Sequence, residues 1–449
     1  MTGPARPSWP ADRRRDATPA ATGRFRTHAG RYRVGPALRL PAHRASSAVL
    51  AGAYPFLAPP PVHAGVPVGL DVLAGGVFCF DPWALYEAGA LSNPNVLLAG
   101  VIGQGKSALA KSLALRAITA GRTVYVPGDP KGEWAPVANA VGGTVLRLGA
   151  GSRTRLNPLD VSTTQDDAGA RSRLLAAVAA VTLHRELTVA ELGALDDALA
   201  QAWRASGQPT VRHIVDALAA PDPRTGERDR LRVDERRADG RDLVHGLRRL
   251  ISGDLAGMFD APSTHHLDPN TPMVVMDLSG LGSDDDALAV AATCAAGWLD
   301  GALGASSAKR WVVYDEAWRL LRHPGLVRRM QAQWKLSRAY GIANLLVVHR
   351  LSDLDAVGPA GSQSRALAEG LLADCSTRIV YRQESDQLTG AAAALGLTGP
   401  ERDLLPLLPR GTGLWKLPRS THVVRHVLTP IEAPLIDTDT AMRETPGRP

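Results

Sequence analysis

A glycine-rich turn between an apolar run and a helical pattern constrains this chain more than any other feature. Residues 96–107 read Val-Leu-Leu-Ala-Gly-Val-Ile-Gly-Gln-Gly-Lys-Ser, and a helical pattern follows over 108–120. The pattern G-x-x-x-x-G-K-[ST] is the phosphate loop, and it is informative when a strand precedes it and a helix follows it. Such loops occur where parallel strands alternate with helices, so the turn predicts an α/β fold.

The residue types in this loop suit a nucleoside triphosphate. Glycines allow backbone N–H groups to curl around an anion, and the helix N-terminus directs positive charge to the same point. Lys106 is expected to reach the β- and γ-phosphates, and the Ser107 hydroxyl to bind Mg²⁺. The sequence therefore predicts ATP and Mg²⁺ as cofactors, with the nucleotide bound by Gly100, Gly103, Gln104, Gly105, Lys106, Ser107 and Ala108.

Lysine is scarce, because only six of the 51 basic residues are lysines. Where arginine is used so freely, a lysine at position 106 fits a site that needs a compact ammonium group instead of a planar guanidinium.

An acidic motif further along the chain supplies the other half of a hydrolytic site. The apolar run 311–314 ends in Asp315 and Glu316. At the carboxyl end of a strand, Asp315 is expected to hold Mg²⁺ beside Ser107, and Glu316 to act as the general base that activates water. A solvated strand end would also carry acids, but the apolar run and the phosphate loop together favour an ATPase.

Three further side chains are candidates for catalysis. His349 follows the apolar run 342–348, where it would sense the γ-phosphate or simply lie in a surface loop. Arg338 and Arg378 are candidate arginine fingers, which stabilise charge on the transferred phosphoryl group. With 45 arginines in the chain, each is equally well explained as a solvated surface residue.

The patterns divide the chain into five parts. Residues 1–65 form a flexible arm rich in Arg and Pro, and 433–449 a flexible tail. Two segments, 66–163 and 256–432, form the ATPase core around an all-helical insertion over 164–255. Strands of a mostly parallel sheet are expected at 77–80, 96–99, 123–126, 144–148, 273–278, 311–314, 342–348 and 377–381.

Charge and composition bear on partners and location. The arm carries ten Arg, no Lys and two Asp, a net charge of +8 against +7 for the whole chain, so the body is nearly neutral. The arm is suited to bind DNA, anionic lipid or protein, or only to keep the chain in solution. The longest apolar stretch, 287–305, is too rich in alanine for a membrane span and contains Asp300. A cytoplasmic location is expected, either free or at the inner face of the cell membrane.

Several motifs resemble one known family. Asp315-Glu316-Ala317-Trp318 resembles the Walker B signature of the type IV secretion, or conjugative transfer, motor ATPases, which belong with the FtsK and HerA DNA pumps. Other segments match the family in the same order: Phe80-Asp81-Pro82-Trp83, Asn93-Pro94-Asn95, Gly128-Asp129-Pro130-Lys131-Gly132-Glu133, Leu156-Asn157-Pro158-Leu159-Asp160 and Arg338-Ala339-Tyr340-Gly341-Ile342. The chain departs from the family at Val348-His349, where Thr-Gln is usual, and has the Arg-rich arm in place of a long N-terminal domain.

The resemblance implies a hexameric ring with ATP at the subunit interfaces, where arginine fingers act. It implies a motor for conjugative DNA transfer or type IV secretion complex assembly, with secretion or conjugation proteins as partners. Two alternatives remain at this stage: a FtsK/HerA-like translocase acting directly on DNA, and a nucleotide-gated scaffold without turnover. The 129–133 turn would line the site or the ring, or serve only as a packed turn.

Overall fold

A computed structural model describes residues 62, 64–149, 151–160, 168–224, 232–265, 268, 270–282, 284–303, 308–349, 362–384 and 388–436, and the backbone of 26–27 and 30–31. The chain divides into two units, Met1–Ala51 and Gly52–Pro449. In the first, β1 (Arg26–Thr27) pairs antiparallel with β2 (Gly30–Arg31). Most of the predicted arm, and residues 437–449 of the predicted tail, lie outside the described residues; Ala433–Ile436 forms helix α17.

The second unit is built on a sheet whose described strands run in the order β4-β3-β13-β12-β11-β5-β10-β9-β6-β8-β7. The run from β11 to β7 is parallel, and the run from β4 to β11 is antiparallel. The predicted α/β fold with a mostly parallel sheet is thus confirmed. The antiparallel flank is not predicted by the sequence. The parallel strands are β11 (Thr377–Val380), β5 (Val96–Ala99), β10 (Ile342–Val348), β9 (Arg310–Tyr314), β6 (Thr123–Asp129), β8 (Met273–Gly280) and β7 (Thr144–Gly149). The flank holds β4 (Val77–Phe80), β3 (Val66–Asp71), β13 (Thr421–His426) and β12 (Thr412–Lys416).

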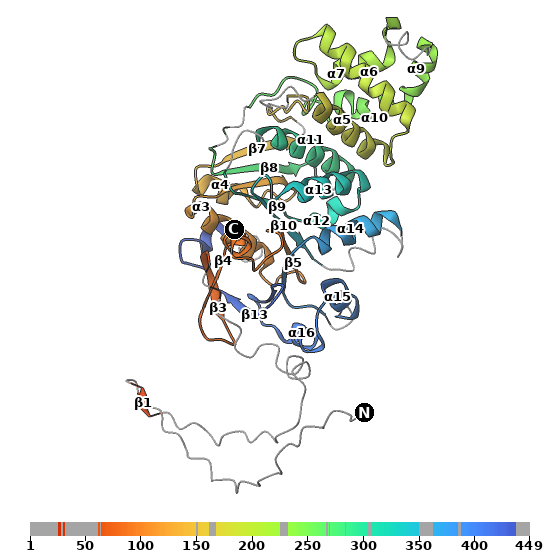
Figure 1. Ribbon diagram of the computed structural model, residues 1–449. Helices are drawn as coiled ribbons and strands as arrows, with labels where there is room; N and C mark the ends of the chain where they lie inside the picture. The colour runs from red at the N-terminus through yellow and green to blue at the C-terminus, as the bar shows by residue number, and fades with distance from the viewer. Residues whose placement is uncertain are drawn as a thin grey trace, which may run out of the picture. The chain divides into compact units, whose positions relative to one another are not determined.

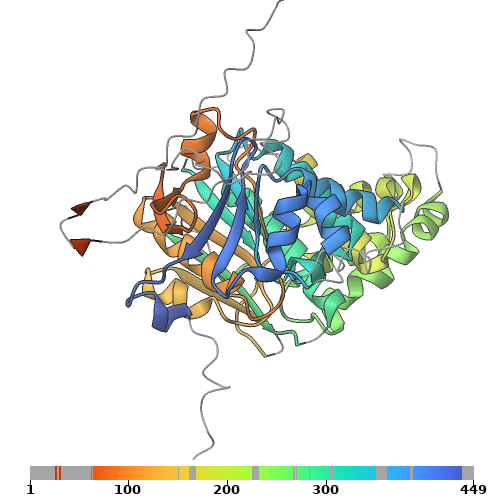
Figure 2. The same ribbon diagram turned by 90° about the horizontal axis from the view of Figure 1, so that it is seen from below.

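Helices cover both faces of the sheet (Figure 2). Alternate residues of β5 show the two cores: Leu97 and Ala99 pack in one apolar cluster, Val96 and Leu98 in the other. A strand buried on both faces gains stability from apolar residues at every position, which explains the uninterrupted apolar runs. One face is covered by α2 (Pro82–Glu87), α3 (Lys106–Thr119) and α4 (Ala135–Ala140), the other by α11 (Asp285–Leu303), α12 (Ala317–Leu321), α13 (Pro324–Leu336) and α14 (Gln363–Ala373).

Between β7 and β8 the described residues contain helices and no strand, as expected for the insertion (Figure 1). These helices are α5 (Ala168–Leu183), α6 (Val189–Ala205), α7 (Val211–Ala219), α9 (Val233–Asp239) and α10 (Arg241–Ser252). A capping box of Thr188 and Glu191 starts α6. Helix α5 packs against α11 and joins the group to the core. Two more helices, α15 (Leu388–Leu395) and α16 (Gly399–Leu404), and the 3-10 turn η3 (Leu405–Leu407) lead into β12. Among the described helices, none has the length and apolarity to cross a bilayer.

A partly buried ion pair anchors α3, the helix that follows the phosphate loop. Arg116 Nε and Nη2 each lie 2.7 Å from an oxygen of Glu432 near the end of the described chain. The same guanidinium donates to carbonyl oxygens of β3 and of Val427. Burial alone would raise the pKa of Glu432, but the hydrogen bonds from Arg116 and from the Thr429 amide outweigh it and lower the pKa to about 2.

This depressed pKa predicts a pH-dependent contribution to stability. The contribution is complete above the unfolded-state pKa of Glu432 and is lost as the pH falls from about 4.5 towards 2. Between pH 5 and pH 3.5, the stability difference between wild type and Glu432→Gln is expected to shrink by about 1 kcal/mol. Thermal unfolding at a series of pH values measures this. Glu369→Gln, which removes the carboxylate of an exposed pair with Arg365, is the control; the same pH dependence in both variants would contradict the assignment.

Candidate nucleotide-binding site

The sheet order brings four chain segments to one edge. Strands β5, β10, β9 and β6 are parallel neighbours, so their carboxyl ends meet at that edge. The segments that follow them are the phosphate loop, His349, the Asp315-Glu316 pair and the 129–133 turn. Ligands of open α/β sheets bind beyond the carboxyl ends of the strands.

The phosphate loop has the backbone shape that the sequence predicts. Gly105 precedes α3 with φ of 99°, a conformation that favours glycine. At Gly100 a Cβ would lie 2.5 Å from Cβ of Tyr381 in the neighbouring chain segment, so only glycine fits. Backbone hydrogen bonds join the loop to two other chain segments. Val101 N donates to the Arg382 carbonyl (3.1 Å), and Gly411 N donates to the Gln104 carbonyl (3.0 Å).

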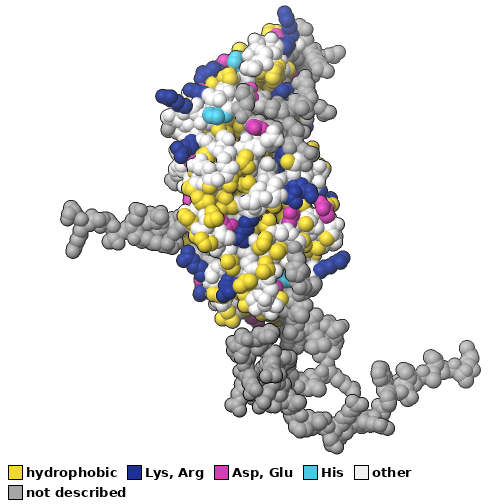
Figure 3. Space-filling model, turned by 90° about the vertical axis from the view of Figure 1, so that its left-hand side faces the viewer, with side chains coloured by type: hydrophobic (Ala, Val, Ile, Leu, Met, Phe, Trp, Pro, Cys, Tyr) yellow, Lys and Arg dark blue, Asp and Glu magenta, His cyan; other side chains and the backbone are white. Residues whose placement is uncertain are grey.

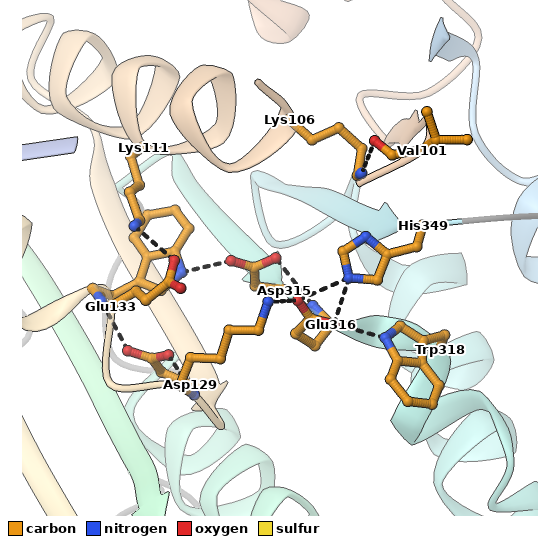
Figure 4. Close-up of polar contacts among 11 residues, drawn as sticks. Val101, Lys106, Lys111, Asp129, Glu133, Asp315, Glu316, Trp318 and His349 are labelled. Atoms are coloured by element: carbon orange, nitrogen blue, oxygen red, sulfur yellow. Dashed lines mark hydrogen bonds and ion pairs between the residues drawn. The ribbon is translucent and has the colours of Figure 1, made fainter. Parts of the chain in front are cut away.

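Lys106 and Ser107 stand at the first turn of α3. The Lys106 ammonium is buried and donates to the Val101 carbonyl within the loop at 2.9 Å (Figure 4). Ser107 is half-buried. The lysine thus folds back over its own loop, where the phosphates of a nucleotide would lie.

Asp315 is a buried carboxylate at the end of β9. Its Oδ2 accepts from the Trp134 indole at 2.9 Å and its Oδ1 from the Glu316 amide at 3.0 Å. Burial raises the pKa of Asp315, and the charge of Glu316 adds to that rise. Within the described part of the chain Asp315 has no ion-pair partner. A carboxylate and a hydroxyl are the oxygen donors that Mg²⁺ prefers, so Asp315 and Ser107 fit that ion.

Glu316 is the most constrained side chain of the site. It is the N-cap of α12 and has a φ of 51°, in the left-handed region that non-glycine residues rarely occupy. Its carboxylate accepts from the Trp318 indole at 2.6 Å and from His349 Nε2 at 2.7 and 2.9 Å, and forms an ion pair with Lys131 (Figure 4). Burial would raise the pKa of Glu316, but the hydrogen bonds from His349 and Lys131 outweigh it and lower the pKa to about 2. Backbone strain of this kind gathers at functional sites.

The sequence predicts that the 129–133 turn lines the site or the ring but does not single out Lys131, whose side chain reaches Glu316. Its turn is organised by Asp129, which accepts from the amides of Lys131 (3.2 Å) and Trp134 (2.8 Å). Burial raises the pKa of Asp129 to about 6, against the effect of these amide donors. A second lysine, the fully buried Lys111 of α3, pairs with Glu133 at 3.1 Å and ties the turn to the helix. The scarcity of lysine is the sequence signal that could have indicated Lys131. Three of the six lysines of the chain, Lys106, Lys111 and Lys131, lie at this site.

The structure brings His349 into the site but not the two arginines. His349 contacts Glu316 through Nε2, and its buried Nδ1 has no hydrogen-bond partner among the described residues. Arg338 lies in the exposed turn before β10, at the sheet edge opposite the phosphate loop. Arg378 lies within β11, and its Nη1 donates to the Leu395 carbonyl at the end of α15 (2.7 Å). Their role as fingers, acting on a neighbouring subunit, stays a prediction.

Comparison with solved structures identifies the fold. No protein-family model and no curated protein matches the sequence. The structure is similar to that of VirB4 of Thermoanaerobacter pseudethanolicus, with a TM-score of 0.68 and 22% identity over 83% of this chain and 100% of that one. It is also similar to the plasmid coupling protein TrwB in complex with the ATP analogue ADPNP (TM-score 0.54, 15% identity, 81% of this chain and 89% of that one). A further structure of TrwB, with ADP and Mg²⁺, matches with a TM-score of 0.52 and 15% identity, over 75% of this chain and 85% of that one. The chain therefore has the phosphate-loop α/β fold that VirB4 and the conjugative coupling protein TrwB share.

Proposed function

We propose that this protein is an ATP-hydrolysing motor that powers conjugative DNA transfer or type IV secretion. The observation that carries the proposal is the meeting of the phosphate loop with Asp315 and Glu316 at one sheet edge. The fold shared with VirB4 and TrwB supports it, as do the bound ADPNP and the bound ADP with Mg²⁺ in the structures of TrwB.

Binding uses the loop and the lysine within it. The backbone N–H groups from Gly103 to Ser107 surround the phosphates, and the N-terminus of α3 faces their charge. When the nucleotide binds, the Lys106 ammonium leaves the Val101 carbonyl and donates hydrogen bonds to the β- and γ-phosphates instead. Ser107 and Asp315 would hold Mg²⁺, which would neutralise charge on the phosphate oxygens.

Hydrolysis transfers the γ-phosphoryl group to water. Glu316 accepts a proton from the attacking water, whose oxygen forms a bond to the γ-phosphorus as the bond to the β–γ bridging oxygen breaks. The products are ADP and inorganic phosphate. His349 touches Glu316 and, we propose, orients it and senses the γ-phosphate. Arg338 or Arg378 of a neighbouring subunit would stabilise the charge on the transferred group.

We propose that the chain forms a hexameric ring. A ring would place an arginine of a neighbouring subunit at each nucleotide site. Apolar side chains cover much of one face of the described surface, with Lys and Arg scattered among them (Figure 3). The exposed apolar side chains of the chain include Val72, Val77 and Ile431, which are 54%, 50% and 81% exposed. Exposed apolar surface favours contacts between proteins, either between subunits or with secretion and conjugation proteins at a cytoplasmic site. DNA would be bound by the arm.

The experiment that tests the function is ATP hydrolysis measured without DNA and with single- or double-stranded DNA. Turnover that depends on Glu316 and is indifferent to DNA supports a secretion motor that awaits protein partners. Strong stimulation by DNA would identify a translocase that acts directly on DNA. Saturable ATP binding without product in every condition would contradict the enzymatic proposal and favour a nucleotide-gated scaffold.

A further inference from the structure

Three donors surround the Glu316 carboxylate, and one of them is a cation. A carboxylate offers about four lone-pair sites. His349 Nε2, with its single hydrogen, lies within reach of both oxygens, while Lys131 contacts Oε1 and Trp318 contacts Oε2. The ion pair with Lys131 stabilises the charged carboxylate and so weakens its affinity for a proton, and Glu316 becomes a better base for water when that pair breaks.

Lys131 is the donor best able to leave. Its side chain is 49% exposed, whereas that of His349 is 18% exposed. Trp318 belongs to α12, only two residues beyond Glu316, and is fixed to it by the helix. The backbone of Lys131 is held by Asp129, and Gly132 completes the turn with φ of 69°. The long stem can therefore swing while its base stays in place.

The γ-phosphate of ATP is the natural competitor for this ammonium group. Glu316 acts on the γ-phosphate through a single water, so a group that touches Glu316 lies close to that phosphate. The ammonium is a compact charge with three donors and binds phosphate as readily as carboxylate. ADP lacks the γ-phosphate and offers no such competition.

We propose that Lys131 is a positioning residue that holds Glu316 as a weak base in the absence of ATP and moves to the γ-phosphate when ATP binds. The inference rests on the proposed function and deepens it, because it makes Glu316 a better base only when a triphosphate is present. It also gives the 129–133 turn a role in distinguishing ATP from ADP.

Amine labelling of the wild-type chain tests the proposal directly. With only six lysines, mass spectrometry can follow the acetylation rate of each. A saturating non-hydrolysable ATP analogue is expected to slow acetylation of Lys131 about tenfold, since a rise of one pKa unit lowers the reactive fraction tenfold. ADP at saturation should leave the rate unchanged. Lys309, which pairs with Glu87 at the opposite sheet edge, is the internal reference.

A pair of variants gives an independent readout. Lys131→Met is expected to weaken binding of the ATP analogue about tenfold and to leave ADP affinity within about threefold, because a single charged hydrogen bond is lost. Lys131→Arg should restore part of the difference, and Lys309→Met should show none. Equal labelling of Lys131 with the analogue and with ADP, or equal losses of affinity for both, would overturn the inference. If neither nucleotide binds to the wild type, it is the proposed function that fails.

Discussion

Replacing Glu316 with Gln is expected to abolish ATP turnover while nucleotide affinity stays close to that of the wild type. The amide keeps the size of the side chain but cannot accept a proton from water. General-base catalysis contributes about 10²- to 10⁴-fold to a rate, so kcat should fall by at least about 10²-fold. The hydrogen-bond and ion-pair partners of the Glu316 carboxylate in the described structure are Trp318, His349 and Lys131, none of them in the phosphate loop, so the affinity for nucleotide should change less than about threefold.

The assay pairs steady-state phosphate release with equilibrium binding of a fluorescent ATP analogue. Glu87→Gln is the matched control, because Glu87 is an exposed acid whose ion pair with Lys309 lies far from the loop. Its kcat should equal that of the wild type. A Glu316→Gln variant that still turns over ATP at more than a tenth of the wild-type rate would remove Glu316 from its assigned role.

Replacing Lys106 with Met is expected to abolish nucleotide binding itself. The Met side chain keeps the buried stem and removes the ammonium. Each hydrogen bond to a charged phosphate is worth about 1.5–3 kcal/mol, so loss of two contacts weakens binding by about 10²- to 10³-fold or more. A ligand at 100 times its Kd stabilises the folded chain by about 2.7 kcal/mol. The Tm increase that Mg-ATP gives the wild type should therefore vanish in the variant.

Thermal unfolding with and without Mg-ATP measures this second effect. Lys309→Met removes an ammonium at the other edge of the sheet and should keep the full increase in Tm. Since Lys106 is buried, the Tm of the variant without nucleotide is compared first, and the test uses only the shift that Mg-ATP adds. An undiminished shift in Lys106→Met would place the nucleotide elsewhere.

The parallel part of the sheet could be predicted because its signals are local. The apolar runs of β5 and β10 have the predicted bounds, and helices α6 and α7 of the predicted insertion begin after the N-caps Thr188 and Thr210. Such elements owe their limits to adjacent residues: buried runs, caps and glycines. Helix α13 ends at Leu336, because residues 337–341 form the turn into β10.

The antiparallel flank could not be predicted, because distant residues decide it. β13 pairs with β3, and His422 on one strand contacts Asp71 on the other across 351 residues of sequence at 2.8 Å. Thr421–His426 is short and partly polar, so its pattern does not distinguish a strand from a loop. Its strand conformation depends on partners that the sequence does not place.

The site, like the fold, contains residues that the sequence predicts and residues that it does not. The phosphate loop and the Asp315-Glu316 pair are recognisable from spacing, because the loop shape and the proposed role of the carboxylates need those residue types in that order. Lys131 and Trp134 reach the site only because β6 lies beside β9, which is a property of sheet order. His349 is predicted either to sense the γ-phosphate or to lie in a surface loop, and in the structure it contacts Glu316. Its sensing role remains a prediction.

The most direct measurement is the release of inorganic phosphate from Mg-ATP by the purified wild-type chain, with Glu316→Gln as the blank. The proposed function predicts phosphate release by the wild type that requires Mg²⁺ and exceeds that of the blank at least about 10²-fold. If a fluorescent ATP analogue saturates the site and yet the wild type releases no more phosphate than the blank, with or without DNA, the protein is not an ATP-hydrolysing motor.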